Sequence, residues 1–123
     1  GAKKGCGVGE CGGCTVIIND EETVDSCIYL AVWADGKKIT TVEGITPENG
    51  LSDVQESFVE EGAVQCGYCT PGLIVSSTFL LSKNSNPSES EIRRGISGNL
   101  CRCTGYTKII KAVERTIKLR NEK

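Results

Sequence analysis

The sequence predicts an α+β protein of two small units, a β-rich unit followed by a helical one. Its eight cysteines fall into two groups of four, with none between Cys27 and Cys66. Charge divides in a similar way: the first 62 residues hold twelve acidic and four basic side chains, whereas the rest of the chain holds four acidic and ten basic ones. We expect units at residues 1–43 and 51–123, joined by a connector at 44–50 whose Gly, Pro and Asn content is typical of turns.

Strands and loops are predicted for the first unit. The β-branched run at residues 15–18 predicts a strand, which turns at the Asn-Asp pair that follows it and returns in a second strand. Residues 38–42 predict a further strand, whereas residues 28–34 fit either a helix or a strand. Trp33 is expected in the core of this unit.

Helices are predicted for the second unit. The Ser-x-x-Gln and Ser-x-x-Glu patterns that begin at Ser52 and Ser88 fit capping boxes, in which side chains satisfy the free N–H groups of a helix start. Thr70, which Pro71 follows, predicts another helix start. A last helix is expected to begin at residues 104–106, because apolar residues then recur at helical spacing. These four short helices are expected to form a small bundle.

The composition excludes several functions. There is no histidine, which rules out His-based catalysis, His-bearing zinc sites, haem held by His and Rieske-type clusters. A net charge of −2 argues against a dedicated nucleic-acid-binding protein, and no apolar stretch is long enough to span a membrane. No secretion signal opens the chain, so we expect a cytoplasmic protein that binds neither nucleic acid nor membrane.

The first four cysteines have the spacing of a plant-type [2Fe–2S] site. Cys6, Cys11 and Cys14 form a C-x4-C-x2-C pattern, and Cys27 follows at a distance. Six of the fifteen glycines lie in residues 1–13, so this loop can wrap tightly at φ values that a Cβ would penalise. Backbone N–H groups of such a loop can face the sulfurs and favour the more negative, reduced state of a cluster.

The second four cysteines form a C-x2-C pair, Cys66 and Cys69, and a distant C-x-C pair, Cys101 and Cys103. Cys69 and Cys103 each precede a predicted helix, whose free N–H groups and positive dipole end favour a thiolate and an anionic cluster. On spacing alone, four thiolates also suit structural zinc. Disulfides are a third interpretation, although nothing suggests secretion.

Four motifs carry a resemblance to a known family: GCGVGECGGCTV at residues 5–16, DSC at 25–27, QCGYCTPG at 65–72 and GNLCRCTGY at 98–106. In this order they resemble the iron–sulfur subunit of the molybdenum hydroxylases, the xanthine dehydrogenase and aldehyde oxidoreductase family, and most of all the small subunits of bacterial xanthine dehydrogenases. The resemblance implies two [2Fe–2S] clusters, the first on Cys6, Cys11, Cys14 and Cys27 and the second on Cys66, Cys69, Cys101 and Cys103.

The resemblance also implies a fold. Family members have a β-grasp domain like that of plant ferredoxins, followed by a four-helix bundle, and these match the two predicted units. They carry a long segment before the first cysteine, whereas only residues 1–5 precede Cys6 here. We therefore expect an N-terminally incomplete β-grasp sheet with an unpaired edge.

By the same resemblance, the chain is the electron-transfer subunit of an oxidoreductase and carries no catalytic residue or substrate site of its own. A large subunit that binds molybdopterin would supply electrons to the second cluster, and the first cluster would pass them to FAD on a medium subunit or to another acceptor. Gln65 and Cys103 match positions that face the pterin. The expected activity of the complex is that of xanthine dehydrogenase, with related hydroxylases of aldehydes, nicotinate or other N-heterocycles as alternatives.

Two interpretations from other classes stay open at this point. A zinc-stabilised interaction module would be colourless and would not respond to a reductant. A free-standing ferredoxin-like carrier or redox sensor would be stable alone. The many apolar positions of the helical unit instead favour an obligate partner.

Overall fold

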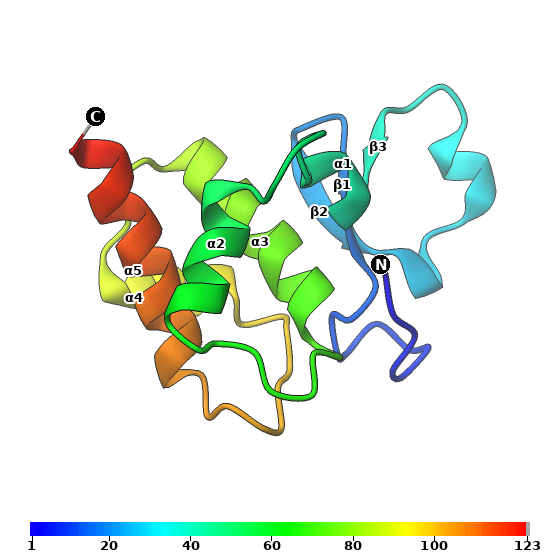
Figure 1. Cartoon of the computed structure of the whole chain (residues 1–123). Coiled ribbons are helices and arrows are strands. Elements are labelled where there is room, and N and C mark those ends of the chain that lie inside the picture. The colour runs from blue at the N-terminus through cyan, green and yellow to red at the C-terminus, as the bar shows by residue number, and fades with distance from the viewer. Residues whose placement is uncertain (123) are drawn as a thin grey trace.

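The computed structural model describes residues 1–122 and contains a three-stranded sheet beside a group of helices (Figure 1). The elements in chain order are β1 (Thr15–Ile18), β2 (Glu22–Asp25), two short 3-10 helices (Ser26–Ile28 and Ala31–Ala34), β3 (Ile39–Thr40), α1 (Val42–Ile45), α2 (Asp53–Glu60), α3 (Thr70–Lys83), α4 (Glu89–Gly95) and α5 (Thr107–Asn121). The α+β class and the order of a β-rich half and a helical half agree with the prediction.

The sheet is antiparallel, with β1 as its central strand in the order β2-β1-β3. Every residue of β1 is buried, and this strand packs against α3. The turn after β1 is tight, since Asn19 and Asp20 both have positive φ, 53° and 58°, a conformation that Asn and Asp tolerate better than other side chains. The predicted first strand and its turn are therefore confirmed.

The third strand is shorter than predicted. Only Ile39 and Thr40 pair with β1, and the chain then enters the single turn of α1. That turn places Val42 and Ile45 on one face, where both pack against the hydrophobic core. The strand therefore ends at Thr40, because the helical turn allows these two side chains to pack against the core.

The segment at residues 28–34 contains parts of the two 3-10 helices rather than a longer helix or a strand. The prediction that Trp33 lies in the core is wrong. Trp33 is 52% exposed and contacts Tyr29 edge-on, with 5.4 Å between the ring centroids. Part of the indole is thus covered by a neighbouring ring rather than by the core.

Both predicted capping boxes form. The Ser52 hydroxyl accepts from the Gln55 N–H while the Gln55 side chain accepts from the Ser52 N–H, at the start of α2. Ser88 and Glu91 make the same reciprocal pair at the start of α4. Each box satisfies two N–H groups that a helix start otherwise leaves free.

The starts of α3 and α5 differ from the prediction. The residue that caps α3 is Cys69, and Thr70 is already helical. The start of α5 is delayed to Thr107, because Gly105 and Tyr106 have φ values of 67° and 72°, outside the right-handed helical region. The helix therefore begins only after the residues that follow the last cysteine have completed a loop.

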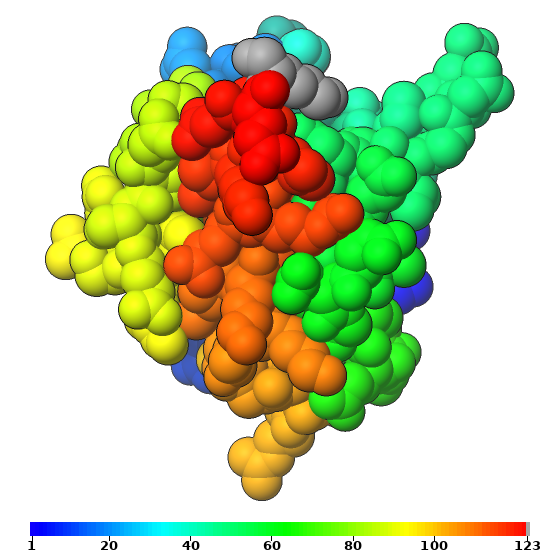
Figure 2. All heavy atoms as spheres, turned by 60° about the vertical axis from the view of Figure 1, so that its left-hand side comes forward, coloured from blue at the N-terminus to red at the C-terminus, as the bar shows by residue number. Residues whose placement is uncertain are grey.

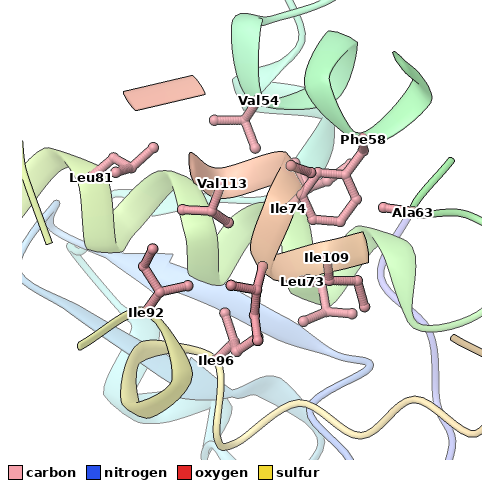
Figure 3. Packing of buried hydrophobic residues seen from close by; sticks show 12 residues of the cluster. Val54, Phe58, Ala63, Leu73, Ile74, Leu81, Ile92, Ile96, Ile109 and Val113 are labelled. Carbon is pink, nitrogen blue, oxygen red and sulfur yellow. The ribbon is translucent and has the colours of Figure 1, made fainter. Parts of the chain in front are cut away.

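The main hydrophobic core lies between the helices. Figure 3 shows side chains from α2, α3, α4 and α5 that meet there, and Figure 2 shows α5 lying between α4 and α2 on one face of the molecule. The buried members are Val54, Phe58, Ala63, Leu73, Ile74, Leu81, Ile92, Ile96, Ile109, Ile110, Ala112 and Val113. Among residues 1–122, no helix combines the length and the apolar character needed to cross a membrane.

Candidate metal centres

The first group of cysteines lies in the loop before β1 and just after β2. Cys6 is surrounded by backbone donors: the N–H groups of Val8, Glu10 and Cys11 donate to its Sγ at 3.4, 3.3 and 3.4 Å. Gly7 and Gly9 adopt positive φ in this turn, as the glycine-rich sequence predicts. Together these N–H groups lower the pKa of Cys6 to about 6, so the loop favours a thiolate at this position.

Cys11 and Cys27 interact with Cys6, and Cys14 is joined to the group through Cys27. Cys11 is in hydrogen-bond contact with Cys6, and its Sγ accepts from the Gly13 N–H at 3.5 Å. The Cys27 N–H donates to Cys14 Sγ at 3.4 Å, which holds the chain after β2 against the loop. Burial and the Cys14 thiol raise the pKa of Cys27, which also interacts with Cys6. The structure therefore brings together all four cysteines that the sequence grouped.

The second group forms where two distant loops meet, residues 61–69 before α3 and residues 96–106 before α5. In Figure 1 both loops lie at the lower end of the helical half. The Cys66 thiol contacts that of Cys103, and the Cys69 thiol contacts that of Cys101. All four cysteines of this group are thus also brought together, although more than thirty residues of chain separate the two pairs.

The two thiols on the inner side of the second group differ in their electrostatics. Burial, followed by the contact with Cys101, raises the pKa of Cys69 to about 12. Burial acts against the charged form of Cys101 as well, but hydrogen bonds from Thr104, Cys69 and Cys103 together outweigh it and lower the pKa of Cys101. The hydroxyl of Thr104 donates to Cys101 Sγ at 3.1 Å. Within this pair, Cys101 is therefore the more readily ionised thiol.

A tyrosine shapes the loop that carries Cys101 and Cys103. The Tyr106 hydroxyl accepts from the Cys101 N–H at 2.7 Å, and the Tyr106 N–H donates to the Thr104 hydroxyl at 3.1 Å. These contacts account for the positive φ of Tyr106 and for the late start of α5. Of the two expected helix starts, only that of α3 directly follows a cysteine, because Cys103 lies four residues before Thr107.

The two groups lie next to each other. A cavity of about 220 Å³ is lined by Cys11 of the first group and by all four cysteines of the second, together with Gly5, Gly13, Tyr68, Leu100 and Arg102. Across this boundary the Leu100 N–H donates to the Cys11 carbonyl at 2.9 Å. Tyr68, from the second group's loop, donates its hydroxyl to the Lys4 carbonyl. The cysteine loops of the two halves are therefore directly hydrogen-bonded.

Exposure differs across the second group. Cys66 and Cys103 are exposed, whereas Cys69 and Cys101 are partly buried. Gln65, the other residue expected to face a pterin, is exposed beside Cys66, and Arg102 is exposed between the two later cysteines. One side of this group thus opens to the surface of the chain, and the other side faces α3 and the first group.

The arrangement of thiols suits two-iron clusters. All eight cysteines are free rather than joined in disulfides. Within residues 1–122, no three His, Cys, Asp or Glu side chains converge as the ligands of a single metal ion do. The thiols lie in two groups of four with N–H and O–H donors directed at sulfurs. A [2Fe–2S] cluster takes four thiolates, and such donors tune its potential.

Sequence reasoning missed two polar residues near these groups. The sequence places Thr104 only at an expected helix start. Its contact with Cys101 depends on the loop that Tyr106 closes. Asn99 appeared only within a motif, yet it is buried, with 4% exposure. A buried Asn gives no periodic signal in a sequence, so its partners become visible only in the structure.

Comparison with known proteins agrees with this geometry. Residues 41–114 match the family described as "[2Fe-2S] binding domain". The iron–sulfur-binding subunit of xanthine dehydrogenase from Escherichia coli O157:H7 is 54% identical over 116 residues, which cover 90% of this chain and 70% of that subunit. The small FeS subunit of nicotinate dehydrogenase from Eubacterium barkeri is 51% identical over 116 residues, which cover 94% of this chain and 73% of that subunit.

A solved structure shows the same likeness in three dimensions. Quinoline 2-oxidoreductase from Pseudomonas putida 86 contains a chain that superposes with a TM-score of 0.91 at 42% identity, covering 99% of this chain and 76% of that one. An α+β fold with a [2Fe–2S] binding domain and two cysteine groups defines an iron–sulfur protein. The chain belongs to the family of iron–sulfur subunits of molybdenum hydroxylases, the electron-transfer subunits of oxidoreductases of the xanthine dehydrogenase and aldehyde oxidoreductase type.

Proposed function

We propose that the chain holds two [2Fe–2S] clusters, one in each cysteine group. The observation that carries this proposal is that eight free thiols gather as two separate fours, each with hydrogen-bond donors directed at its sulfurs. The ligands would be Cys6, Cys11, Cys14 and Cys27 for the first cluster and Cys66, Cys69, Cys101 and Cys103 for the second. When bound, such clusters accept and release one electron at a time.

The residues of the chain would tune the two sites in different ways. Around Cys6 the donors are backbone N–H groups, which substitution of side chains cannot remove. At Cys101 a side chain supplies the donor, the hydroxyl of Thr104 at 3.1 Å from Sγ. Because hydrogen bonds to the sulfurs raise the potential of a cluster, Thr104 is the residue through which the second site is most easily adjusted.

We propose the same division of the chain as the sequence suggests. A β-grasp unit at residues 1–43 would precede a connector at 44–50 and a four-helix unit at 51–123, whose last residue, Lys123, lies outside the described residues. The family match at 41–114 begins close to this boundary, and the third strand ends just before it. The three-stranded antiparallel sheet is compatible with part of a β-grasp sheet.

The second site would face the molybdopterin of a large subunit, with Gln65 and Cys103 toward the pterin. Support comes from exposure, since Gln65, Cys66 and Cys103 all reach the surface of the chain. The first site would deliver electrons to FAD on a medium subunit or to another acceptor. The relatives are named as subunits of larger enzymes, and the eight free thiols fit a reducing, cytoplasmic location.

For the whole complex we propose hydroxylation of a purine, as in xanthine dehydrogenase. Identity to the xanthine dehydrogenase subunit of Escherichia coli O157:H7 is 54%. The second candidate is nicotinate, since identity to the nicotinate dehydrogenase subunit is 51%. Assays of the purified complex with xanthine and with nicotinate decide between the two, because each substrate should reduce the iron–sulfur chromophores only in its own enzyme.

The proposed cofactors are tested by purifying the chain with its native partners and measuring metals and visible absorbance. The expected result is about four irons per chain, bleaching of the visible absorbance by dithionite, and a molybdenum-containing partner in the same fraction. Zinc in place of iron, with no colour and no bleaching, would mean that the thiols build a structural zinc module instead.

A further inference from the structure

A buried asparagine joins the two cysteine groups. The Asn99 amide donates to the Gly12 carbonyl at 3.0 Å and to the Thr15 hydroxyl at 3.3 Å. Its oxygen accepts from the Ser76 hydroxyl at 2.6 Å. The side chain is only 4% exposed, and its hydrogen bonds tie its own loop to two other segments of the protein, the start of β1 and α3. A buried amide held in this way fixes its neighbours, since each bond is costly to leave unmade.

Three backbones approach closely at the same place. A Cβ added to Gly12 would lie 2.3 Å from the Gly98 carbonyl, and a Cβ added to Gly72 would lie 2.2 Å from the Gly12 carbonyl. These distances are far below van der Waals contact, so the loop before β1, the first turn of α3 and the loop before α5 meet without intervening side chains. The Leu100 N–H to Cys11 carbonyl bond of 2.9 Å adds a backbone link beside them.

Each of the three segments carries cysteines of the proposed clusters. Gly12 lies between Cys11 and Cys14, Asn99 lies two residues before Cys101, and the helix of Ser76 begins directly after Cys69. A shift at this junction would therefore move one cysteine group relative to the other. The separation between two redox centres sets how strongly they interact. The junction therefore controls the distance between the two proposed clusters, on which electron transfer depends.

We propose that Asn99 is a positioning residue that fixes the separation of the two cysteine groups, and thereby the interaction between the clusters they would hold. This inference rests on the proposed function, since it requires a cluster in each group. It assigns Asn99 neither a ligand role nor a contact with substrate. Its role is exerted through Gly12 on the first group and through Ser76 and its own loop on the second.

The test is electron paramagnetic resonance of the dithionite-reduced complex at low temperature, with Asn99→Ala compared with the wild type. Dipolar broadening between two reduced clusters falls with the cube of their separation, so it reports position rather than stability. The expected result is loss of this broadening in Asn99→Ala, with both signals retained. Asn49→Ala is the matched control, because Asn49 is exposed in the connector, and it should keep the wild-type broadening.

A second pair of variants decides the question if Asn99→Ala fails to retain iron. The Thr15 hydroxyl donates to the Gly12 carbonyl at 2.6 Å and accepts from Asn99. Thr15→Val removes this hydroxyl and should lose the broadening, whereas Thr15→Ser keeps it and should behave as wild type. Unchanged broadening in Thr15→Val or in Asn99→Ala with full iron content overturns the inference, as do two unbroadened signals in the wild type. Absence of two-iron signals from the wild type overturns the proposed function itself.

Discussion

At the scale of single residues, Thr104 shows how a side chain can tune a proposed cluster. Its hydroxyl lies 3.1 Å from Cys101 Sγ and is itself oriented by the Tyr106 N–H at 3.1 Å. The hydroxyl proton is thereby directed to the sulfur. Neither contact is visible in the sequence, which shows only a Thr close to a cysteine.

Thr104→Val should lower the reduction potential of the second cluster. One hydrogen bond contributes about 0.5–1.5 kcal/mol net, which for a one-electron couple corresponds to a fall of roughly 20–60 mV. Thr104→Ser is the matched control and should keep the wild-type potential. The measurement is a redox titration followed by the signal of the second cluster, and an equal potential in Thr104→Val would show that the hydroxyl does not tune it.

Gly12 provides a second test at this scale. Its φ is +74°, and an added Cβ would meet the Gly98 carbonyl at 2.3 Å, whereas Gly36 has a φ of +75° with no atom within 4 Å of such a Cβ. Gly36→Ala should therefore lower the free energy of unfolding by only about 1–2 kcal/mol, the cost of placing an Ala in the left-handed conformation.

Gly12→Ala should lower the free energy of unfolding by clearly more than Gly36→Ala, because the backbone of the junction must also separate. The two variants are compared by urea unfolding followed by circular dichroism. An equal loss of unfolding free energy in the two variants would mean that the loop before β1 is free to move away from the loop before α5.

At the scale of elements, the helix starts that carry capping boxes followed the sequence closely. Ser52 with Gln55 and Ser88 with Glu91 form their boxes as predicted, because the pattern contains both donor and acceptor within one turn. The starts of α3 and α5 were displaced by one to three residues, since they depend on the loops around Cys69 and Tyr106. Helix starts whose capping residues all lie within four residues were predicted correctly. Helix starts that depend on how a loop closes were not.

The box at α4 predicts a pH dependence that the box at α2 lacks. The Ser88 N–H lowers the pKa of Glu91, so the ionised carboxylate is favoured in the folded state. Its contribution to stability is complete above the unfolded pKa of about 4.3 and is lost as the pH falls through the lower, folded value.

Glu91→Gln keeps the capping box but does not titrate, as Gln55 already illustrates at α2. Relative to wild type, the variant should therefore gain stability as the pH is lowered from 7 to 3. Urea unfolding of both proteins across this range checks the prediction. A difference between the two proteins that stays constant with pH would contradict it.

At the scale of the whole molecule, the sequence predicted the chemistry better than the architecture. The grouping of cysteines followed from spacing, because short C-x2-C and C-x4-C intervals leave few ways to place the thiols. How the two groups lie relative to each other did not follow, because it depends on Asn99, on the backbone contacts of Gly12 and on the bond between Leu100 and the Cys11 carbonyl. The Asn99–Gly12 and Leu100–Cys11 contacts join residues more than eighty positions apart.

The exposed Trp33 and the short third strand are failures of the same kind. Trp33 is apolar and aromatic, which favours burial on average, but the chain folds it outward beside Tyr29. Val42 leaves the predicted strand and, together with Ile45, packs against the helical core. Which apolar side chains enter the core depends on tertiary packing, and local sequence patterns do not contain that information.

Each cysteine group is proposed to hold its own [2Fe–2S] cluster. The most direct test is electron paramagnetic resonance with spin counting on the fully reduced native complex, in the wild type and in variants that replace Cys27 or Cys101 by Ser. Two distinct spin-half signals are expected, each about one spin per chain, with a different signal lost in each variant. A single signal in the wild type, or loss of both signals in either variant, would contradict the assignment of one cluster to each group.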